Sequence, residues 1–178
     1  MKEIRVLDKK FREMISGDSI QERIGDLAKQ INTDFAGKEV LFTGILNGAF
    51  MFAADLFKKI DLEASISFVK LASYHGTSTT GTIKELIGWN EEIADKNVII
   101  LEDIIDTGIT LEHIVNEINM KGPAALKVAA LLLKRAAYTR DIPIDYIGFE
   151  IPNDFVVGYG LDYNGFGRNL TSIYTLIH

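Results

Sequence analysis

The residues best suited to chemistry follow a short apolar run at 98–101. Two adjacent carboxylates, Glu102 and Asp103, come directly after this run, and a third carboxylate, Asp106, precedes a turn of small residues that opens a helix. Charged side chains at the carboxyl end of a buried strand lie where open α/β sheets bind their ligands. We therefore expect a ligand site at this point of the chain.

The turn after Asp106 has the composition of a phosphate-binding loop. Thr107, Gly108 and Thr110 supply hydroxyl groups and a flexible backbone, and the free N–H groups of a first helical turn attract an anion. Carboxylates would repel a lone phosphate, so the combination suits a sugar phosphate: the acids accept hydrogen bonds from a vicinal diol, and nearby cations offset the charge. The alternatives are a solvated acidic strand end, a simple turn, and Asp106 as an ordinary helix N-cap.

Composition narrows the class of protein. The chain has 178 residues, 47% of them hydrophobic and 25% charged, with a net charge of −6 and no cysteine. These values are typical of one soluble globular domain, and the negative charge disfavours a general electrostatic grip on nucleic acid. No apolar run approaches the length of a membrane span, and the first five residues lack the apolar core of a signal peptide. We expect a cytoplasmic protein that binds neither membrane nor nucleic acid.

Apolar strand-like runs alternate with segments of helical periodicity. A capping box with Ser19 as the cap and Glu22 three residues later predicts the start of the first helix, which ends before Gly37. Strands are predicted at 40–46, 66–72, 98–101, 126–133 and 145–149. The residues predicted to face the core are Ile20, Ile24, Leu27, Ala28 and Ile31 in the first helix, Phe50, Ala53, Ala54 and Phe57 in the second, and Leu111, Ile114, Val115 and Ile118 in the third, which stops at Gly122.

The alternation predicts an α/β fold with a largely parallel sheet and right-handed crossovers. Two segments depart from it. Residues 75–81 contain no large apolar side chain, and we expect a mobile loop there. The tail from Asp154 is rich in glycine and aromatic residues, and we expect it to form a small flap over the sheet.

The run from Glu102 to Thr110 resembles the phosphoribosyl-pyrophosphate (PRPP) signature of the type I phosphoribosyltransferases, and the resemblance extends from about residue 40 to residue 170. It implies a mostly parallel twisted sheet flanked by helices, with a small hood formed by the chain termini. On this basis residues 1–178 form a single phosphoribosyltransferase domain, with a core at about 36–140 and a hood at about 1–10 and 141–178.

The resemblance assigns roles around PRPP. Glu102 and Asp103 would hold the ribose hydroxyls and a metal ion, Asp106 would act as a general base or acid close to N7 of a purine, and the threonine-glycine turn would bind the 5′-phosphate. Asn47 and Gly48 occupy the loop that contacts pyrophosphate, where many relatives have a Lys-Gly pair, so Asn47 is a departure from the family pattern. Ser73 and Tyr74 match the lid over the reaction centre.

The tail is similar to the hood of the hypoxanthine-guanine phosphoribosyltransferases. In that comparison Lys134 contacts the oxygen at C6 of the purine, Phe155 stacks on the ring, and three further residues complete the site: Val156 and Leu161 border the base, and Arg168 binds pyrophosphate. Asp162 would hold Mg²⁺, a cation suited to carboxylate and phosphate oxygens.

The resemblance thus implies purine salvage: transfer of the phosphoribosyl group to hypoxanthine, and guanine, with Mg²⁺ as cofactor, in a homodimer or homotetramer. The sequence leaves three questions open. The enzyme could prefer xanthine or another base, the chain could be a non-catalytic regulatory relative, and the metal could be contacted directly or only through the ribose.

Overall fold

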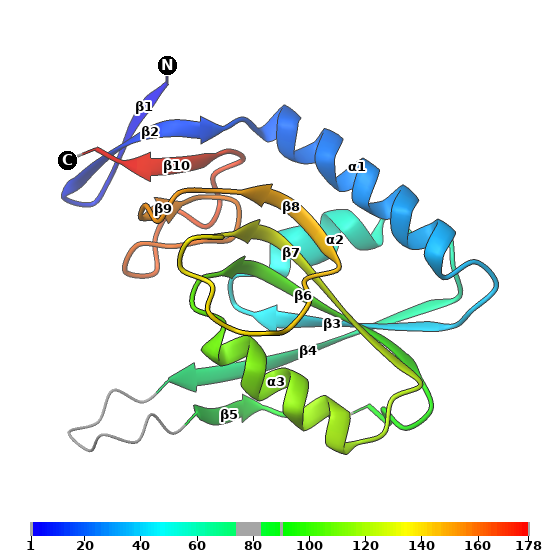
Figure 1. Ribbon diagram of the computed structural model, residues 1–178. Helices are drawn as coiled ribbons and strands as arrows, with labels where there is room; N and C mark the ends of the chain where they lie inside the picture. Colours follow the sequence, from blue (N-terminus) through cyan, green and yellow to red (C-terminus); the bar gives the residue numbers. More distant parts are fainter. Residues whose placement is uncertain (1, 74–82, 90, 178) are drawn as a thin grey trace.

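The computed structural model describes residues 2–73, 83–89 and 91–177, which form two β-sheets and three helices (Figure 1). The larger sheet has six strands in the order β5-β4-β3-β6-β7-β8, all parallel except β5, which pairs antiparallel with β4. Its strands are β3 (Val40–Leu46), β4 (Ala64–Ser73), β5 (Ile83–Ile87), β6 (Asn97–Ile105), β7 (Ala125–Leu133) and β8 (Tyr146–Glu150). The predicted α/β class with a mostly parallel sheet is confirmed.

Helices cover both faces of this sheet. Helices α1 (Gly17–Asp34) and α2 (Phe50–Phe57) pack on one face, and α3 (Ile109–Met120) packs on the other. Each face has its own cluster of buried side chains, and β3 and β6 contribute alternate residues to both clusters. Because both faces are covered, β3 is buried along almost its whole length, as expected for a central strand of a parallel sheet.

Helix α1 begins three residues earlier than predicted. Its N-cap is Ser16, whose hydroxyl accepts a hydrogen bond from the backbone N–H of Ser19 at 3.2 Å. The expected cap at Ser19 is therefore wrong, because Ser19 already lies in the first helical turn and supplies the donor that a cap satisfies. The five residues predicted to face the core are all buried.

Helix α2 has the predicted position but a different buried face. Phe52, Ala53 and Leu56 are buried, whereas Phe50 and Ala54 are exposed. The segment is apolar on nearly every side, so its periodicity fits two faces equally well, and packing against α1 and the sheet selects one of them. In α3, by contrast, three of the four predicted residues are buried, and Val115 packs against the same cluster.

Strand β6 is longer than predicted, and this changes the position of the acidic pair. The strand continues to Ile105, and its pairing with β7 includes Glu102 with Ala130 and Ile105 with Leu133. Glu102 and Asp103 were expected beyond the end of the strand; they lie within its last four residues. Consecutive strand residues point to opposite sides, so the two carboxylates face different parts of the site.

The smaller sheet is antiparallel and brings the two ends of the chain together (Figure 1). Its order is β1-β2-β10-β9, and its strands are β1 (Glu3–Val6), β2 (Lys9–Ile15), β9 (Val156–Val157) and β10 (Ile173–Leu176). The predicted hood from the chain termini is thus present as a sheet. Residues 146–150, which the predicted hood segment of about 141–178 includes, pair with β7 in the larger sheet; the division into core and hood otherwise stays a prediction.

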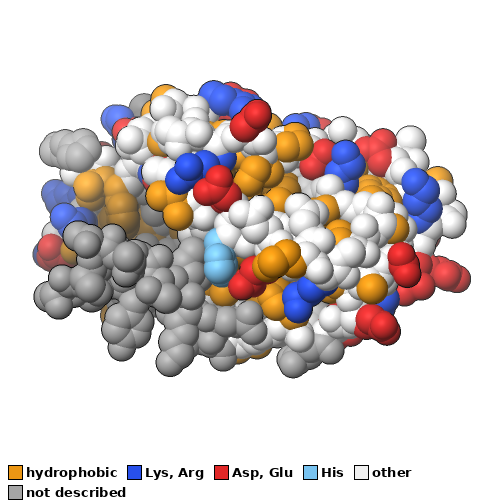
Figure 2. Space-filling model, turned by 60° about the horizontal axis from the view of Figure 1, so that its bottom comes forward, with side chains coloured by type: hydrophobic (Ala, Val, Ile, Leu, Met, Phe, Trp, Pro, Cys, Tyr) orange, Lys and Arg blue, Asp and Glu red, His pale blue; other side chains and the backbone are white. Residues whose placement is uncertain are grey.

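The surface carries charges of both signs. On the face shown in Figure 2, the coloured acidic and basic side chains are interspersed among neutral ones, so as far as the described residues go this face presents no extended positive surface. Among the described residues, no helix is both long enough and apolar enough to cross a membrane.

Candidate active site

In the acidic pair on β6, Glu102 is buried and Asp103 is partly buried, which disfavours their charged forms. Glu102 is only 6% exposed, and burial raises its pKa well above the ordinary value, with the neighbouring Asp103 carboxylate adding to the effect. Burial also raises the pKa of Asp103 to about 6, although the backbone N–H of Ile104 donates to its carboxylate at 2.9 Å and Arg168 lies near enough to favour its charge. Two carboxylates held in such a place need a ligand or a cation to offset their charge.

Asp103 lies against the turn that follows β3. A Cβ atom at Gly48 would overlap Oδ2 of Asp103, so a larger residue there would displace the Asp103 carboxylate. The peptide bond between Leu46 and Asn47 is cis, and Asn47 is exposed. The structure therefore brings the Asn47-Gly48 turn and one carboxylate of the acidic pair into direct contact.

The other carboxylate, Glu102, faces the turn that opens α3. It lines a small cavity of about 120 Å³ together with residues 104–111. The N-cap of α3 is Gly108, which has φ of 86° and provides no side-chain cap for the free N–H groups of the first turn. These groups lie at a cavity that also has Thr107 and Thr110 in its wall, which is an arrangement suited to an anion.

Asp106 is not the helix cap. Its carboxylate Oδ2 lies 2.9 Å from Nζ of Lys134, whose side chain is only 11% exposed. The pairing follows from the sheet: Ile105 and Leu133 are register partners at the ends of β6 and β7, so the residues that follow them emerge side by side. The structure thus places a hydrogen-bond acceptor and a cation next to each other at the edge of the site.

The hood places aromatic and apolar residues nearby in the fold. Phe155 is 45% exposed, and its ring lies 5.9 Å from that of Tyr163 in an edge-on arrangement, and 6.3 Å from that of Phe11. Val156 is buried in β9, and Leu161 is buried in the main core. Phe155 is therefore held by two aromatic rings and remains partly exposed to solvent.

Arg168 connects the hood to the acidic strand. Its Nη2 lies 2.7 Å from Oδ1 of Asp162, and its Nη1 donates to the carbonyl oxygen of Gly160 at 2.6 Å. Both Arg168 and Asp162 act on the pKa of Asp103, the arginine lowering it and the aspartate raising it. The three charged side chains therefore share one region, although they come from β6 and from the tail.

Two predicted residues are not placed by the structure. Tyr74 lies outside the described residues, and Ser73 is described only by its backbone at the end of β4. Their predicted role in a lid stays a prediction.

The carboxylates do not by themselves form a metal cage. Among the residues that the structure describes, no three or more acidic, histidine or cysteine side chains are grouped closely enough to hold a metal ion. Any cation held by Glu102, Asp103 or Asp162 would need further ligands from solvent or substrate.

The structure adds residues that the sequence did not single out. A Cβ atom at Gly108 would lie 2.5 Å from Tyr138 and 2.8 Å from Arg140, so the segment after β7 packs against the 107–110 turn. A Cβ atom at Gly160 would overlap the carbonyl oxygen of Gly48. The Gly-Tyr-Gly sequence at 158–160 was a usable signal, because two glycines around a tyrosine indicate a close backbone approach; nothing local marked Tyr138 or Arg140.

Comparisons with known proteins agree with this geometry. A family model described as the phosphoribosyl transferase domain matches residues 16–164. The chain is 38% identical over 176 residues to the hypoxanthine-guanine phosphoribosyltransferase of Aquifex aeolicus (strain VF5), covering 98% of each. It is 40% identical over 164 residues to that of Staphylococcus aureus (strain Mu50 / ATCC 700699), covering 92% of each.

A solved structure shares the whole fold. The hypoxanthine-guanine phosphoribosyltransferase of Bacillus anthracis, crystallised with a HEPES molecule in its active site, superposes with a TM-score of 0.87 at 40% identity, covering 94% of this chain and 97% of that one. The resemblance inferred from the acidic strand and its turn is therefore confirmed along nearly the entire chain. The chain belongs to the phosphoribosyltransferase family, among the hypoxanthine-guanine phosphoribosyltransferases.

Proposed function

We propose that this protein catalyses a purine-salvage reaction, the transfer of the 5-phosphoribosyl group from PRPP to hypoxanthine and guanine. The products are IMP or GMP and pyrophosphate. The observation that carries the proposal is the Lys134–Asp106 pair beside the anion-binding turn of α3, in a chain whose relatives are named for this activity.

The phosphoribosyl half of the substrate fits the β6 edge. The turn at 107–110 would receive the 5′-phosphate on the free N–H groups of α3. Glu102 and Asp103 would accept hydrogen bonds from the ribose hydroxyls, and their negative charge would favour the positive charge that develops at C1′ as pyrophosphate departs. Arg168 would bind the pyrophosphate through its forked donors, and the backbone N–H groups of Asn47 and Gly48 would contact it from the other side.

The base half fits the Lys134–Asp106 pair. A 6-oxopurine that reacts at N9 presents a carbonyl oxygen at C6 and an N7–H on the same edge. Lys134 would donate to the C6 oxygen, and Asp106 would accept the N7 proton as the bond between N9 and C1′ forms. The proton released by the base thus goes to the carboxylate, while the C1′–O bond electrons leave with pyrophosphate. Phe155 would stack on the ring, with Val156 and Leu161 at its border.

Magnesium fits this donor set. Asp103 and Asp162 lie near enough to influence one another and carry hard oxygen donors, and Mg²⁺ is usually held by one or two carboxylates together with substrate phosphates and water. The absence of a three-carboxylate cage among the described residues is consistent with such shared binding. Asp162, with Glu102 or Asp103, would hold the ion, which supplies charge neutralisation for the leaving pyrophosphate when bound.

We also propose that the protein works in the cytoplasm as a homodimer or homotetramer. The sequence contains no cysteine, in keeping with a reducing compartment. Size-exclusion chromatography with light scattering would give the number of subunits.

The test is a spectrophotometric assay with PRPP and Mg²⁺ on hypoxanthine, guanine, xanthine and adenine in parallel. We expect turnover on hypoxanthine and guanine, and little on adenine, because the Lys134 ammonium recognises a carbonyl at C6 and is repelled by an amino group there. A preference for xanthine would show that xanthine, and not hypoxanthine or guanine, is the main substrate. Folded protein that turns over none of the four bases would refute the proposal.

A further inference from the structure

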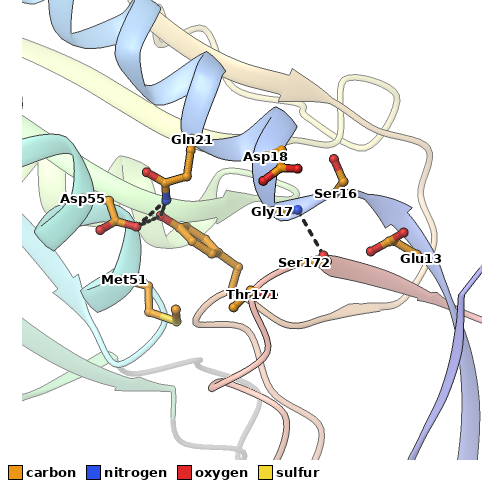
Figure 3. Close-up of a pocket in the computed structure, with 10 residues that line it drawn as sticks. Glu13, Ser16, Gly17, Asp18, Gln21, Met51, Asp55, Thr171 and Ser172 are labelled. Atoms are coloured by element: carbon orange, nitrogen blue, oxygen red, sulfur yellow. Dashed lines mark hydrogen bonds between the residues drawn. The ribbon is translucent and has the colours of Figure 1, made fainter.

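A carboxylate outside the proposed site has an unusual number of hydrogen-bond donors. Asp55 of α2 accepts hydrogen bonds from the hydroxyl of Tyr159 and from Nε2 of Gln21 at 2.6 Å, and Nζ of Lys58 lies 2.6 Å from its other oxygen. Figure 3 shows Gln21 of α1 and Asp55 of α2 pointing toward one another across the wall of a cavity. These donors come from α1, from the residue that follows α2 and from the hood, so Asp55 joins three parts of the fold.

The donor from the hood sits on an unusual backbone. Tyr159 has φ of 49°, in the left-handed region, between Gly158 at 108° and Gly160 at 96°. A bulky residue in that region is uncommon and costs free energy. The tyrosine is nevertheless only 2% exposed, so its packing and its hydrogen bond to Asp55 must offset the cost. Such an observed outlier indicates a function for the position.

The protonation states of Tyr159 and Asp55 favour the hydrogen bond between them. Burial and the hydrogen bond to Asp55 raise the pKa of Tyr159 far above its ordinary value, so the tyrosine remains the donor. Burial acts to raise the pKa of Asp55, but the hydrogen bonds from Lys58, Tyr159 and Gln21 hold it below its ordinary value. A charged acceptor and a neutral donor make the stronger kind of hydrogen bond.

The contact is next to the proposed pyrophosphate region. Gly160 follows Tyr159, packs on the carbonyl oxygen of Gly48 and accepts a hydrogen bond from Arg168. Gly48 in turn packs on Asp103, and α2, which carries Asp55, begins directly after the 46–48 turn. Tyr159 and Asp55 therefore join the 158–162 turn of the tail to the helix that follows the 46–48 turn, and these two turns pack against each other.

We propose that Tyr159 and Asp55 are positioning residues for PRPP. Their hydrogen bond holds the 158–162 turn against the 46–48 turn, so that Arg168, Asp162 and Asp103 face one pyrophosphate group. Neither residue touches the substrate. The inference rests on the proposed function and adds a residue pair that acts on PRPP and not on the base.

The first test is Tyr159→Phe, which removes the hydroxyl and keeps the ring. We expect the KM for PRPP to rise about tenfold, the range of one hydrogen bond to a charged group, while the KM for hypoxanthine and kcat change by less than about twofold. The matched control is Tyr146→Phe. Tyr146 is also 2% exposed, and its hydroxyl donates to Asp34 at 2.8 Å between β8 and α1. The control should lose comparable thermal stability and keep the KM for PRPP.

A second test isolates the pair. In a double-mutant cycle with Asp55→Ala, the combined variant should raise the KM for PRPP little more than either single variant, because both remove the same hydrogen bond. If Asp55→Ala does not fold, the KM for PRPP of Tyr159→Phe is compared with that of Tyr146→Phe, and this comparison tests the positioning role. An unchanged KM for PRPP in Tyr159→Phe, or an equal rise in Tyr146→Phe, would overturn the inference.

The inference can also be tested without turnover. Calorimetric titration of the wild type and Tyr159→Phe with inorganic pyrophosphate and Mg²⁺ should show binding about tenfold weaker in the variant. A wild type that binds pyrophosphate but turns over no base would refute the proposed function while this comparison still tests the positioning role. Equal affinity in both proteins, or no pyrophosphate binding by the wild type, would overturn the positioning role.

Discussion

Replacing Asp103 with asparagine should stabilise the free protein and remove most of its activity. Asparagine has nearly the same shape as aspartate, and its carbonyl oxygen still accepts the hydrogen bond from Ile104 that the carboxylate accepts at 2.9 Å. The substitution therefore removes the charge and little else. We expect the two effects to oppose each other because the charge is there for the ligand and not for the fold.

The size of the stabilisation follows from the pKa. The pKa of Asp103 is about 6 in the folded protein against an ordinary 3.8. At about 1.4 kcal/mol for each pKa unit, the ionised side chain destabilises the fold by about 3 kcal/mol. A carboxyl group with a raised folded pKa binds its proton more tightly in the folded state, so wild-type stability falls as the pH rises from about 4 through 6 and then levels off.

The stability of the asparagine variant should not fall in this way as the pH rises, because asparagine does not ionise. Its advantage in free energy of unfolding should be about 1 kcal/mol or less at pH 4 and about 3 kcal/mol at pH 7.5, which corresponds to a rise of about 6–12 °C in Tm. Urea unfolding at pH 4, 6 and 7.5, followed by circular dichroism and by the fluorescence of the single tryptophan Trp89, measures this directly.

The control is Asp154→Asn, since Asp154 is an exposed aspartate of the tail. It should follow the wild type at every pH. The reasoning is refuted if Asp103→Asn is no more stable than the wild type at pH 7.5, or if its advantage is the same at all three pH values. The second expected effect of Asp103→Asn is on activity. Its kcat/KM for PRPP should fall at least about a hundredfold, since the cation and the ribose lose an ionised partner.

Four further outcomes are expected. Asp106→Asn should lower kcat about 10²–10⁴-fold, the range of general acid–base catalysis, with far less change in substrate binding; equal losses in both, measured by steady-state kinetics and calorimetry, would exclude the proton-transfer role. Gly48→Ala should raise the KM for PRPP strongly, because its Cβ would overlap Asp103, and a wild-type KM would show that the turn can move aside. Lys134→Met should reduce kcat/KM for hypoxanthine by about 10–100-fold, because one charged hydrogen bond is lost. It should also reduce the ratio of kcat/KM for hypoxanthine to kcat/KM for adenine. An unchanged ratio of these two values would argue against a contact to the C6 oxygen. Chelation by EDTA should abolish turnover and added Mg²⁺ should restore it, whereas activity that persists in EDTA would contradict the metal requirement.

The sequence predicted the fold well where local pattern decides the structure. The run at 40–46 is apolar except for Thr43 and Gly44 and is bounded by polar residues, and it is strand β3 with those limits. The helix after the acidic strand was recognisable by its spacing, and its buried face follows that spacing. In both cases the periodicity permits a single interpretation, so the local pattern and the tertiary structure agree.

The errors fall where local pattern permits more than one interpretation. Ser16 and Ser19 are both suitable caps, and the choice between them depends on where the strand before the helix ends. Helix α2 is apolar on both candidate faces, and only its partners distinguish Phe52 from Phe50. The acidic pair was expected after the strand because charged residues usually leave a core; here the neighbouring strand β7 extends the ladder past them.

The sequence predicted which residues belong to the site better than it predicted how they are arranged. A short run of sequence brings Glu102, Asp106 and the 107–110 turn together, so their association could be inferred. The contacts of Gly48 with Asp103, and of Gly160 with Gly48, join segments far apart in the chain. They depend on the order of strands in the sheet and on the return of the tail, neither of which a local pattern contains.

The most direct test of the account is to incubate metal-free protein with hypoxanthine and PRPP, add Mg²⁺, and identify the products by mass spectrometry. The account predicts that IMP and pyrophosphate form in equal amounts as hypoxanthine disappears, and only after the metal is added. Hypoxanthine that remains unchanged with PRPP, Mg²⁺ and folded protein present would contradict it.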